Sequence, residues 1–410
     1  MFGSDLPFRQ HHVNMDGHLP EKNPGILFVC RHSPFLGNNG GQQRTRLIFE
    51  YLRSLGHVDL VCMTNDPKPE MDHGPGYTVR YFGSVRYKDR SLLQFLAWRV
   101  KVWDPYTVHP VNDTCRKIVN HLIENNDYRY IVFRYLDAVF LCGQYRRSEL
   151  IIDVDDLPEQ HFYTLFRDPG LKWRSRALQY FNFLLSGLYC RRLIRRSRHA
   201  FFSNPRHAVY PNASCLPNIP LIEPRPKEPL PLNGGCLTVL FVGLLTYPPN
   251  VMGMDYFIRQ IWKTVAKTMP DARLRIVGKY ESSATIERWK GVNGVEVTGF
   301  VEDLMQEYKN CALVVAPIYH GSGTNIKVLE AMAVGRTCVI SDFAGRGLEH
   351  ILEGNQNVLI AGDPDQYADA VTGLLRDPGR NDRIRGAAFG AVNARATRDH
   401  FRESLSRVIG

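Results

Sequence analysis

The sequence lacks the features that mark membrane-spanning, secreted and zinc-binding proteins. No apolar run approaches the length needed to cross a bilayer. Residues 1–24 have no apolar core of the kind found in signal peptides, and we expect them to form a polar lead-in. None of the nine cysteines belongs to a Cys-x-x-Cys pair, and several lie in apolar runs. This pattern favours buried, reduced thiols over disulfides or zinc ligands.

The composition is that of an ordinary globular protein, with 44% hydrophobic and 22% charged residues. At 410 residues the chain is long enough for two domains with cores of their own. The net charge of +10 is unevenly spread, because residues 166–200 carry nine basic side chains and one acid, Asp168. Such a patch favours an anionic partner: phospholipid, nucleic acid or an acidic substrate.

The most informative stretch lies between His320 and His350. An apolar run typical of a buried parallel strand, Cys311 to Tyr319, precedes it. A glycine-rich turn follows, then a helical pattern that Gly335 ends, and then the buried strand Thr-Cys-Val-Ile-Ser. The order strand, glycine turn, helix, strand predicts one βαβ unit.

The chemistry of this turn suits a phosphate. Glycines let the backbone approach a ligand, and Thr324 or Asn325 can cap the helix that follows. The free N–H groups and dipole at the helix start favour an anion, and Lys327 adds a positive charge. Glu330, three residues on, can accept two hydrogen bonds from a ribose diol. A structural helix with an ordinary Lys–Glu surface pair explains the same pattern, so the residues alone leave both readings open.

The stretch GSGTNIKVLEAMAVG resembles the donor-site signature of the retaining glycosyltransferases of family 4, which have the GT-B fold. The resemblance implies two Rossmann-like domains facing each other across a cleft, and transfer of a sugar from a nucleotide diphosphate sugar with retention of configuration. Lys327 would be catalytic, and Glu330 would bind the ribose. One departure concerns Ser322, which stands where the fuller family motif has a Glu that contacts the donor sugar.

The resemblance covers residues 25 to the end and also implies the rest of the donor site. The family binds its donor without a metal or another cofactor. The positions that match its donor-binding segments are Gly40, Gly41, Gly243, Thr298, Phe300, Val301, Gly321, Ser322, Gly323, Thr324, Asn325, Val328 and Glu330. Main chain near Thr298 to Val301 would read the nucleobase.

The second half begins with a strand that ends at Gly243. Many relatives carry Arg or Lys directly afterwards, to neutralise the diphosphate, whereas this chain has Leu244 and Leu245. A Tyr-Pro-Pro-Asn turn, residues 247–250, follows, as in one subgroup of the family. The missing charge raises the expected importance of Lys327, with Lys279 as a weaker candidate.

The first half opens with another βαβ pattern, in which a buried strand, Gly25 to Cys30, is followed by a loop without the G-x-G-x-x-G fingerprint. Arg44 follows the Gly40–Gly41 pair, and we expect a solvated helix residue rather than a ligand-binding one. Asp153, Asp155 and Asp156 end a later strand, at the edge where ligands of open α/β sheets gather. A carboxylate cluster suits a metal, a base, acceptor binding or helix capping. The resemblance favours acceptor binding or capping, with Asp155 as a catalytic candidate.

These patterns divide the chain into five segments. We expect a lead-in over 1–24, an acceptor domain over 25–215, a proline-rich linker over 216–235 and a donor domain over 236–393. A C-terminal helix over 394–410 would return to the first domain, as GT-B chains do.

The basic segment 166–200 also predicts where the protein works. It contains one long amphipathic helix, from Leu171 to Arg196, with aromatic residues among the arginines. We expect peripheral contact with anionic lipid at the inner face of the cytoplasmic membrane, and a carbohydrate or lipid-linked acceptor for a surface polysaccharide. A core helix with solvated arginines is the alternative. No RNA- or DNA-binding motif accompanies the charge, so nucleic acid is not an expected partner. Two other functions stay open: a nucleotide-sugar 2-epimerase of the same fold, and a catalytically idle nucleotide-sugar binding protein.

Overall fold

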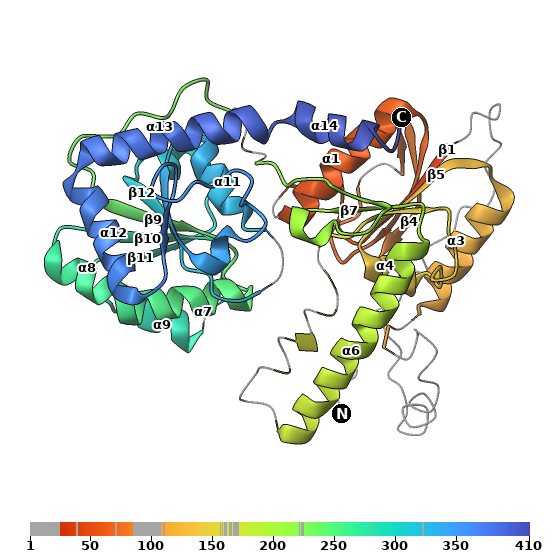
Figure 1. Ribbon diagram of the computed structural model, residues 1–410, viewed down its shortest axis with the longest axis horizontal. Coiled ribbons are helices and arrows are strands. Elements are labelled where there is room, and N and C mark those ends of the chain that lie inside the picture. The colour runs from red at the N-terminus through yellow and green to blue at the C-terminus, as the bar shows by residue number, and fades with distance from the viewer. Residues whose placement is uncertain are drawn as a thin grey trace, which may run out of the picture. The chain divides into compact units, whose positions relative to one another are not determined.

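The chain contains two separate sheets, each within an α/β arrangement (Figure 1). The computed structural model describes residues 25–410 except 38–39, 70–71, 85–107, 110, 156, 158, 160–161, 164–165, 167–171, 221, 223–224, 282 and 322–323. Asp156, Arg167, Ser322 and Gly323 therefore lie outside the described residues. Among the helices of the described part, none is long and apolar enough to span a membrane.

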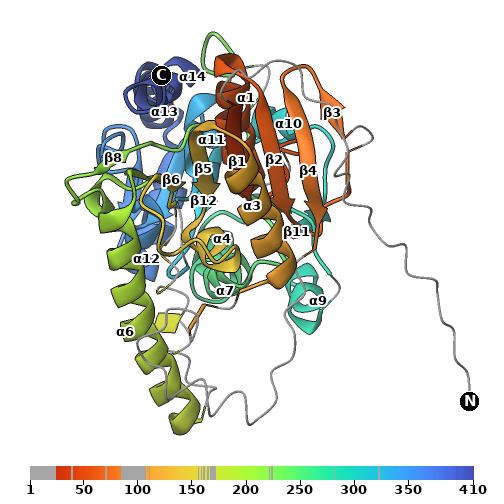
Figure 2. The same ribbon diagram turned by 90° about the vertical axis from the view of Figure 1, so that its right-hand side faces the viewer.

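The first sheet has eight strands in the order β3-β4-β2-β1-β5-β6-β7-β8. Figure 2 shows β1, β2, β4 and β3 side by side. Parallel pairing joins β1 to both β2 and β5, whereas the short β3 pairs with β4 in antiparallel orientation. The strands are β1 Gly25–Cys30, β2 Val58–Met63, β3 His73–Gly74, β4 Tyr77–Gly83, β5 Tyr128–Arg134, β6 Leu150–Asp153, β7 His199–Phe202 and β8 Ala213–Cys215.

Helices connect these strands, as the alternating pattern predicts. They are α1 Gly40–Leu55, α3 Asp113–Asn125, α4 Leu136–Leu141, α6 Trp173–Arg196 and the 3-10 turn η2 Pro205–His207. The Gly40–Gly41 pair forms the first turn of α1 rather than a loop before it. The predicted long helix is confirmed as α6, which begins two residues later than its pattern.

The second sheet has six strands in the order β11-β10-β9-β12-β13-β14. Every neighbouring pair is parallel. In chain order this is 3-2-1-4-5-6, the doubly wound arrangement in which the strand order reverses between β9 and β12. The strands are β9 Thr238–Val242, β10 Arg273–Val277, β11 Val295–Gly299, β12 Leu313–Ala316, β13 Thr337–Ser341 and β14 Leu359–Ala361. The two Rossmann-like α/β domains that the resemblance implies are confirmed.

Helices cover both faces of the second sheet (Figure 1). In the view of Figure 1, α11 and α13 lie above the strands, and α7, α8 and α9 lie below them. The helical segments are α7 Pro248–Tyr256, the π-helical η3 Phe257–Trp262, α8 Lys263–Thr268, α9 Ala284–Lys290, α10 Leu304–Lys309, α11 Ile326–Ala333, the 3-10 turn η4 Asp342–Gly345, α12 Pro364–Arg376, α13 Pro378–Arg395 and α14 Arg398–Ser406. The return of the last helix to the first domain stays a prediction.

Helix α11 ends as the sequence predicts. Gly335 has a φ of +73°, and the N–H groups of Gly335 and Arg336 donate to the carbonyls of Met332 and Ala331. These two bonds form the Schellman motif, which satisfies carbonyls that a helix end leaves open. Leu329, Met332 and Ala333 are buried against the sheet, as their spacing requires.

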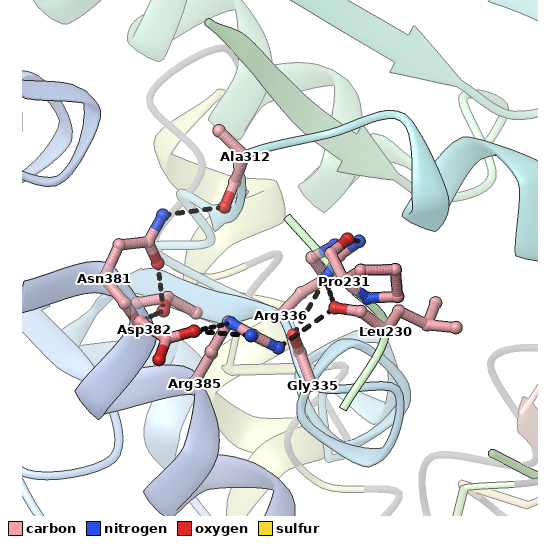
Figure 3. Close-up of polar contacts among 9 residues, drawn as sticks. Leu230, Pro231, Ala312, Gly335, Arg336, Asn381, Asp382 and Arg385 are labelled. Atoms are coloured by element: carbon pink, nitrogen blue, oxygen red, sulfur yellow. Dashed lines mark hydrogen bonds and ion pairs between the residues drawn. The ribbon is translucent and has the colours of Figure 1, made fainter. Parts of the chain in front are cut away.

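A buried arginine ties the end of the proline-rich segment to the second domain (Figure 3). Arg336 Nη1 donates to the Leu230 carbonyl at 2.6 Å, and Nη2 donates to the Pro231 carbonyl at 2.9 Å. Its Nε donates to the Tyr308 carbonyl at 2.6 Å, at the end of α10. The guanidinium therefore satisfies carbonyls of the incoming chain and of a helix end at once.

Candidate functional site

The candidate donor site lies where the strand order of the second sheet reverses. The turn after β9 begins at Gly243, and the turn after β12 contains Gly321. In an open parallel sheet, ligands bind at the carboxyl ends of the strands on either side of this reversal. The two turns that the sequence singles out therefore belong to one crevice.

The turn after β12 and the start of α11 form one side of this crevice. Gly321 has a φ of +124°, a conformation that side chains with a Cβ rarely adopt. Helix α11 begins five residues later with Asn325 as its N-cap, but the Asn325 amide donates to the Ala344 carbonyl at 3.2 Å instead of capping the helix. The N–H groups of Ile326 and Val328 donate to the carbonyls of Thr324 and Asn325, at 2.9 Å each, so the start of α11 acts on an anion chiefly through its dipole.

Lys327 lies in the first turn of α11 and reaches back to the turn after β9. Its Nζ donates to Asn250 Oδ1 at 2.6 Å and lies 4.6 Å from the centre of the Phe241 ring. A Cβ at Gly243 would lie 2.8 Å from the same Nζ, so a larger residue here would displace the lysine side chain. The lysine therefore brings a cation to the turn where relatives have Arg or Lys.

Burial lowers the pKa of Lys327 to about 7, and the nearby Glu330 carboxylate opposes this shift. The ammonium is thus poorly compensated in the ligand-free chain, and an anion in the crevice would favour its charged form. Glu330 itself is half-buried on the same helix, close enough to Tyr308 to raise the pKa of that phenol further. The expected proximity of Lys327 and Glu330 is confirmed, whereas their roles toward a ligand stay predictions.

The predicted nucleobase segment follows β11. Phe300 is 70% exposed directly after this strand, and the half-buried Thr298 and Val301 flank it. The N–H of Gly278 donates to the Gly299 carbonyl at 2.8 Å, which holds this segment at the end of β10. Lys279, the weaker candidate for the diphosphate, is exposed beside it. All of these residues lie at the same carboxyl edge of the sheet as the turns after β9 and β12.

Two of the predicted donor residues need comment. Val328 is fully buried, so its side chain packs in the core, and its N–H donates to the Asn325 carbonyl at 2.9 Å. Thr324 is half-buried at the end of the glycine turn, and its carbonyl accepts from the N–H of Ile326 at 2.9 Å.

A second polar cluster lies at the carboxyl edge of the first sheet. Asp153, the last residue of β6, is 1% exposed and accepts from Arg44 Nε at 2.9 Å and Nη2 at 2.6 Å. Arg134 is the register partner of Asp153 at the end of β5, and its Nη1 lies 2.7 Å from Asp153 Oδ2, the oxygen that also accepts from Arg44 Nε. The expectation of a solvated Arg44 is wrong, because this ion pair draws the side chain into the core at 2% exposure.

The strand reversal of the first sheet, between β1 and β5, contains two residues that the sequence reasoning missed. Tyr135 follows β5 with a φ of +78°, a strained value for a residue with a side chain, and its hydroxyl accepts from Arg134 Nη2 at 3.0 Å. His32 follows β1, and its ring meets that of Tyr135 edge-on at 5.5 Å. Burial, and then the Arg134 charge, lower the pKa of His32. Gly41 lies directly against both side chains.

The remaining predicted carboxylate, Asp155, lies two residues after β6 with a φ of +50°. Its carbonyl accepts from Ser203 Oγ at 3.3 Å. The described part of the acidic cluster therefore separates into a buried, ion-paired Asp153 and a half-buried Asp155. A charge at the end of each of two neighbouring apolar strands, Arg134 and Asp153, is the signal that could have revealed this pairing.

Comparison with known proteins gives a family match over part of the chain and a similar fold over nearly all of it. Residues 236–377 match the model of the family described as glycosyl transferases group 1. A Klebsiella pneumoniae relative, described as an uncharacterized 44.6 kDa protein in the cps region, is 23% identical over 377 residues, which are 85% of this chain and 92% of the relative.

Two solved structures are similar over nearly the whole chain. Sucrose-phosphate synthase from Thermosynechococcus elongatus matches with a TM-score of 0.63 at 16% identity, covering 94% of this chain and 98% of its own. The Anabaena protein Alr3699/HepE, in complex with UDP and glucose, matches with a TM-score of 0.59 at 13% identity, covering 94% of this chain and 99% of its own. The predicted GT-B fold is confirmed.

Proposed function

We propose that this chain, whose residues 236–377 match the group 1 glycosyl transferases, transfers a sugar from a nucleotide diphosphate sugar to an acceptor. The observation that carries the proposal is the convergence of Lys327 and the start of α11 on the Gly243 turn, at the strand reversal of the second sheet. A helix start and a cation that share one crevice provide what a diphosphate needs.

The donor is proposed to lie along the carboxyl edge of the second sheet. Its diphosphate would rest at the turns of Gly243 and Gly321, its ribose at Glu330, and its base near Phe300. The Anabaena structure, which contains UDP and glucose, supports this type of donor.

The chemical step that we propose is transfer with retention at the anomeric carbon. The acceptor would attack from the face that the diphosphate leaves, and a departing phosphate oxygen would take the acceptor's proton. Negative charge then grows on the leaving diphosphate, and Lys327 and the positive end of the α11 dipole are placed to stabilise it. Asp155 is the proposed catalytic residue on the acceptor side.

The acceptor is proposed to be a lipid-linked or surface-polysaccharide precursor. The relative that lies in a cps region supports a polysaccharide product. Helix α6 supports membrane contact, because only its second half contains buried residues. No residue of α6 before Ser186 is buried. Trp173, Tyr180, Phe181 and Leu184 are among its exposed large side chains.

The positive charge on α6 is also accessible. Arg191, Arg192, Arg195 and Arg196 are all exposed, although Leu193 and Ile194 between them are buried. Exposed aromatic residues near one end and exposed arginines near the other suit a surface of anionic lipid. We therefore propose peripheral contact with the inner face of the cytoplasmic membrane.

Replacement of Glu330 tests the donor site. Glu330→Ala is expected to weaken binding of the preferred nucleotide by about 1.5–3 kcal/mol, the range for hydrogen bonds to a charged group. A thermal-shift screen of UDP-, GDP-, ADP- and TDP-sugars identifies the nucleotide, and titration calorimetry measures the loss. Glu403→Ala, an exposed acid on α14, is the matched control and should bind as wild type does. Unchanged affinity in Glu330→Ala would show that the donor assignment is wrong.

A further inference from the structure

The side-chain amide of Asn250 can adopt only one of its two orientations. Asn250 is the third residue of α7, after the Tyr-Pro-Pro turn, and it is buried. Its Nδ2 donates to the Leu244 carbonyl at 2.8 Å, and its Oδ1 accepts from Lys327 Nζ at 2.6 Å. A carbonyl can only accept and an ammonium can only donate, so both partners require the same orientation of the amide.

This contact fixes where the lysine charge can be. The Lys327 side chain lies between the Asn250 amide and the Phe241 ring, over a glycine whose missing side chain leaves the space. Glu330, on the same helix, is the charged group that acts on it, whereas β9 and α7 present Phe241 and Asn250, which do not titrate. The amide oxygen is thus a neutral acceptor that directs the ammonium without neutralising it.

We propose that Asn250 is a positioning residue that holds Lys327 Nζ beside Gly243, where the diphosphate of a donor would meet it. The identity of the ligand rests on the proposed function, whereas the coupling of Asn250 to Lys327 does not. A neutral acceptor suits this role better than a carboxylate, because a carboxylate would hold the ammonium equally well but would repel the diphosphate.

A consequence for pH follows from burial, which lowers the pKa of Lys327 to about 7 in the ligand-free chain. A bound diphosphate favours the ammonium and raises this pKa, so binding above pH 7 requires uptake of a proton. Donor affinity is therefore highest below pH 7 and falls as the pH rises. For a bound-state pKa well above 8.5, the expected fall between pH 6 and pH 8.5 is about 30-fold.

The experiment compares Asn250→Asp and Asn250→Leu with wild type and with Asn310→Asp. Asn310 is exposed directly after α10, at the amino end of β12. Asn310→Asp therefore adds the same charge at the opposite edge of the sheet. Lysine labelled with carbon-13 at Cε reports the pKa of Lys327, whose signal is assigned by its loss in Lys327→Arg. Asn250→Asp should raise this pKa by at least one unit, Asn250→Leu should lower it, and Asn310→Asp should leave it unchanged.

Affinity is then measured by calorimetry from pH 6 to pH 8.5, with UDP-glucose as the first probe and the best binder of the nucleotide-sugar screen as the second. The affinity of wild type should fall about 30-fold between pH 6 and pH 8.5. Asn250→Asp should bind more weakly than wild type at pH 6 and lose little on going to pH 8.5.

The two possible failures are distinguishable. An unchanged Lys327 pKa in Asn250→Asp would overturn the role of Asn250, whatever the donor does. If wild type binds none of the nucleotide sugars, the proposed function is wrong. The diphosphate is then also not the group that Lys327 contacts. Asn250→Asp is nearly isosteric, so the comparison does not depend on the folding of Asn250→Leu.

Discussion

At the scale of single residues, one carboxylate organises the carboxyl edge of the first sheet. Asp153 is buried between Arg44 of α1 and Arg134 of β5, so two buried guanidinium groups share one negative charge. Removing the shared partner leaves both cations without compensation, whereas removing one cation leaves a complete pair. The two kinds of substitution should therefore differ in cost.

Asp153→Asn is expected to lower the free energy of unfolding by about 3–5 kcal/mol, and Arg44→Met by clearly less, because Arg134 still pairs with Asp153. Urea denaturation followed by circular dichroism measures both. Asp113→Asn, an exposed acid in the first turn of α3, serves as a control for loss of a carboxylate and should cost less than 1 kcal/mol. Equal losses in Asp153→Asn and Arg44→Met would contradict the shared pairing.

At the scale of elements, the two halves of α6 differ, since only the half from Ser186 onward contains buried residues. If the exposed arginines hold anionic headgroups, then replacing Arg191, Arg192, Arg195 and Arg196 by Gln should release the protein from anionic liposomes and spare nucleotide binding. Co-sedimentation of wild type should fall as salt is added, since headgroup attraction is screened. Neutral liposomes are the control, and wild type that ignores anionic liposomes at low salt would point to a soluble acceptor.

The elements themselves were largely predictable from the sequence. The apolar runs Gly25 to Cys30 and Thr337 to Ser341 became β1 and β13 with the same bounds, because buried parallel strands are apolar on both faces. Helix α7 was foreseen only as a turn. Its proline pair is compatible with the first turn of a helix, where two missing N–H groups cost nothing, so the pattern permits both outcomes.

At the scale of the whole molecule, local patterns predicted two Rossmann-like domains, but not the contacts that cross the chain. Arg44 and Asp153 are 109 residues apart, and Lys327 and Asn250 are 77 apart. No local rule pairs such positions, because their proximity depends on strand order and on the helices between them. The glycine turn before α11 was therefore predictable, whereas the burial of Arg44 and the contact of Asn250 with Lys327 were not.

Arg336 also shows where the second domain begins as a cooperative unit. The family match starts at Cys236, yet the Arg336 guanidinium binds the carbonyls of Leu230 and Pro231, and the Leu230 N–H donates to the Val334 carbonyl at 3.0 Å. An amide held this way exchanges its hydrogen only when the structure that holds it opens. In the full-length chain, the Leu230 amide should therefore exchange as slowly as the amides of β13. This strand lies between β12 and β14 in the second sheet.

In Arg336→Lys, a single ammonium cannot reach all of these carbonyls, and protection should be lost first at Leu230 while β13 keeps its own. Hydrogen exchange read by NMR or mass spectrometry distinguishes the two segments. Fast exchange at Leu230 in wild type would instead place the start of the unit at β9. Slow exchange at Leu230 would mean that the last part of the proline-rich segment is not a flexible linker. It would unfold together with the second domain and not before it.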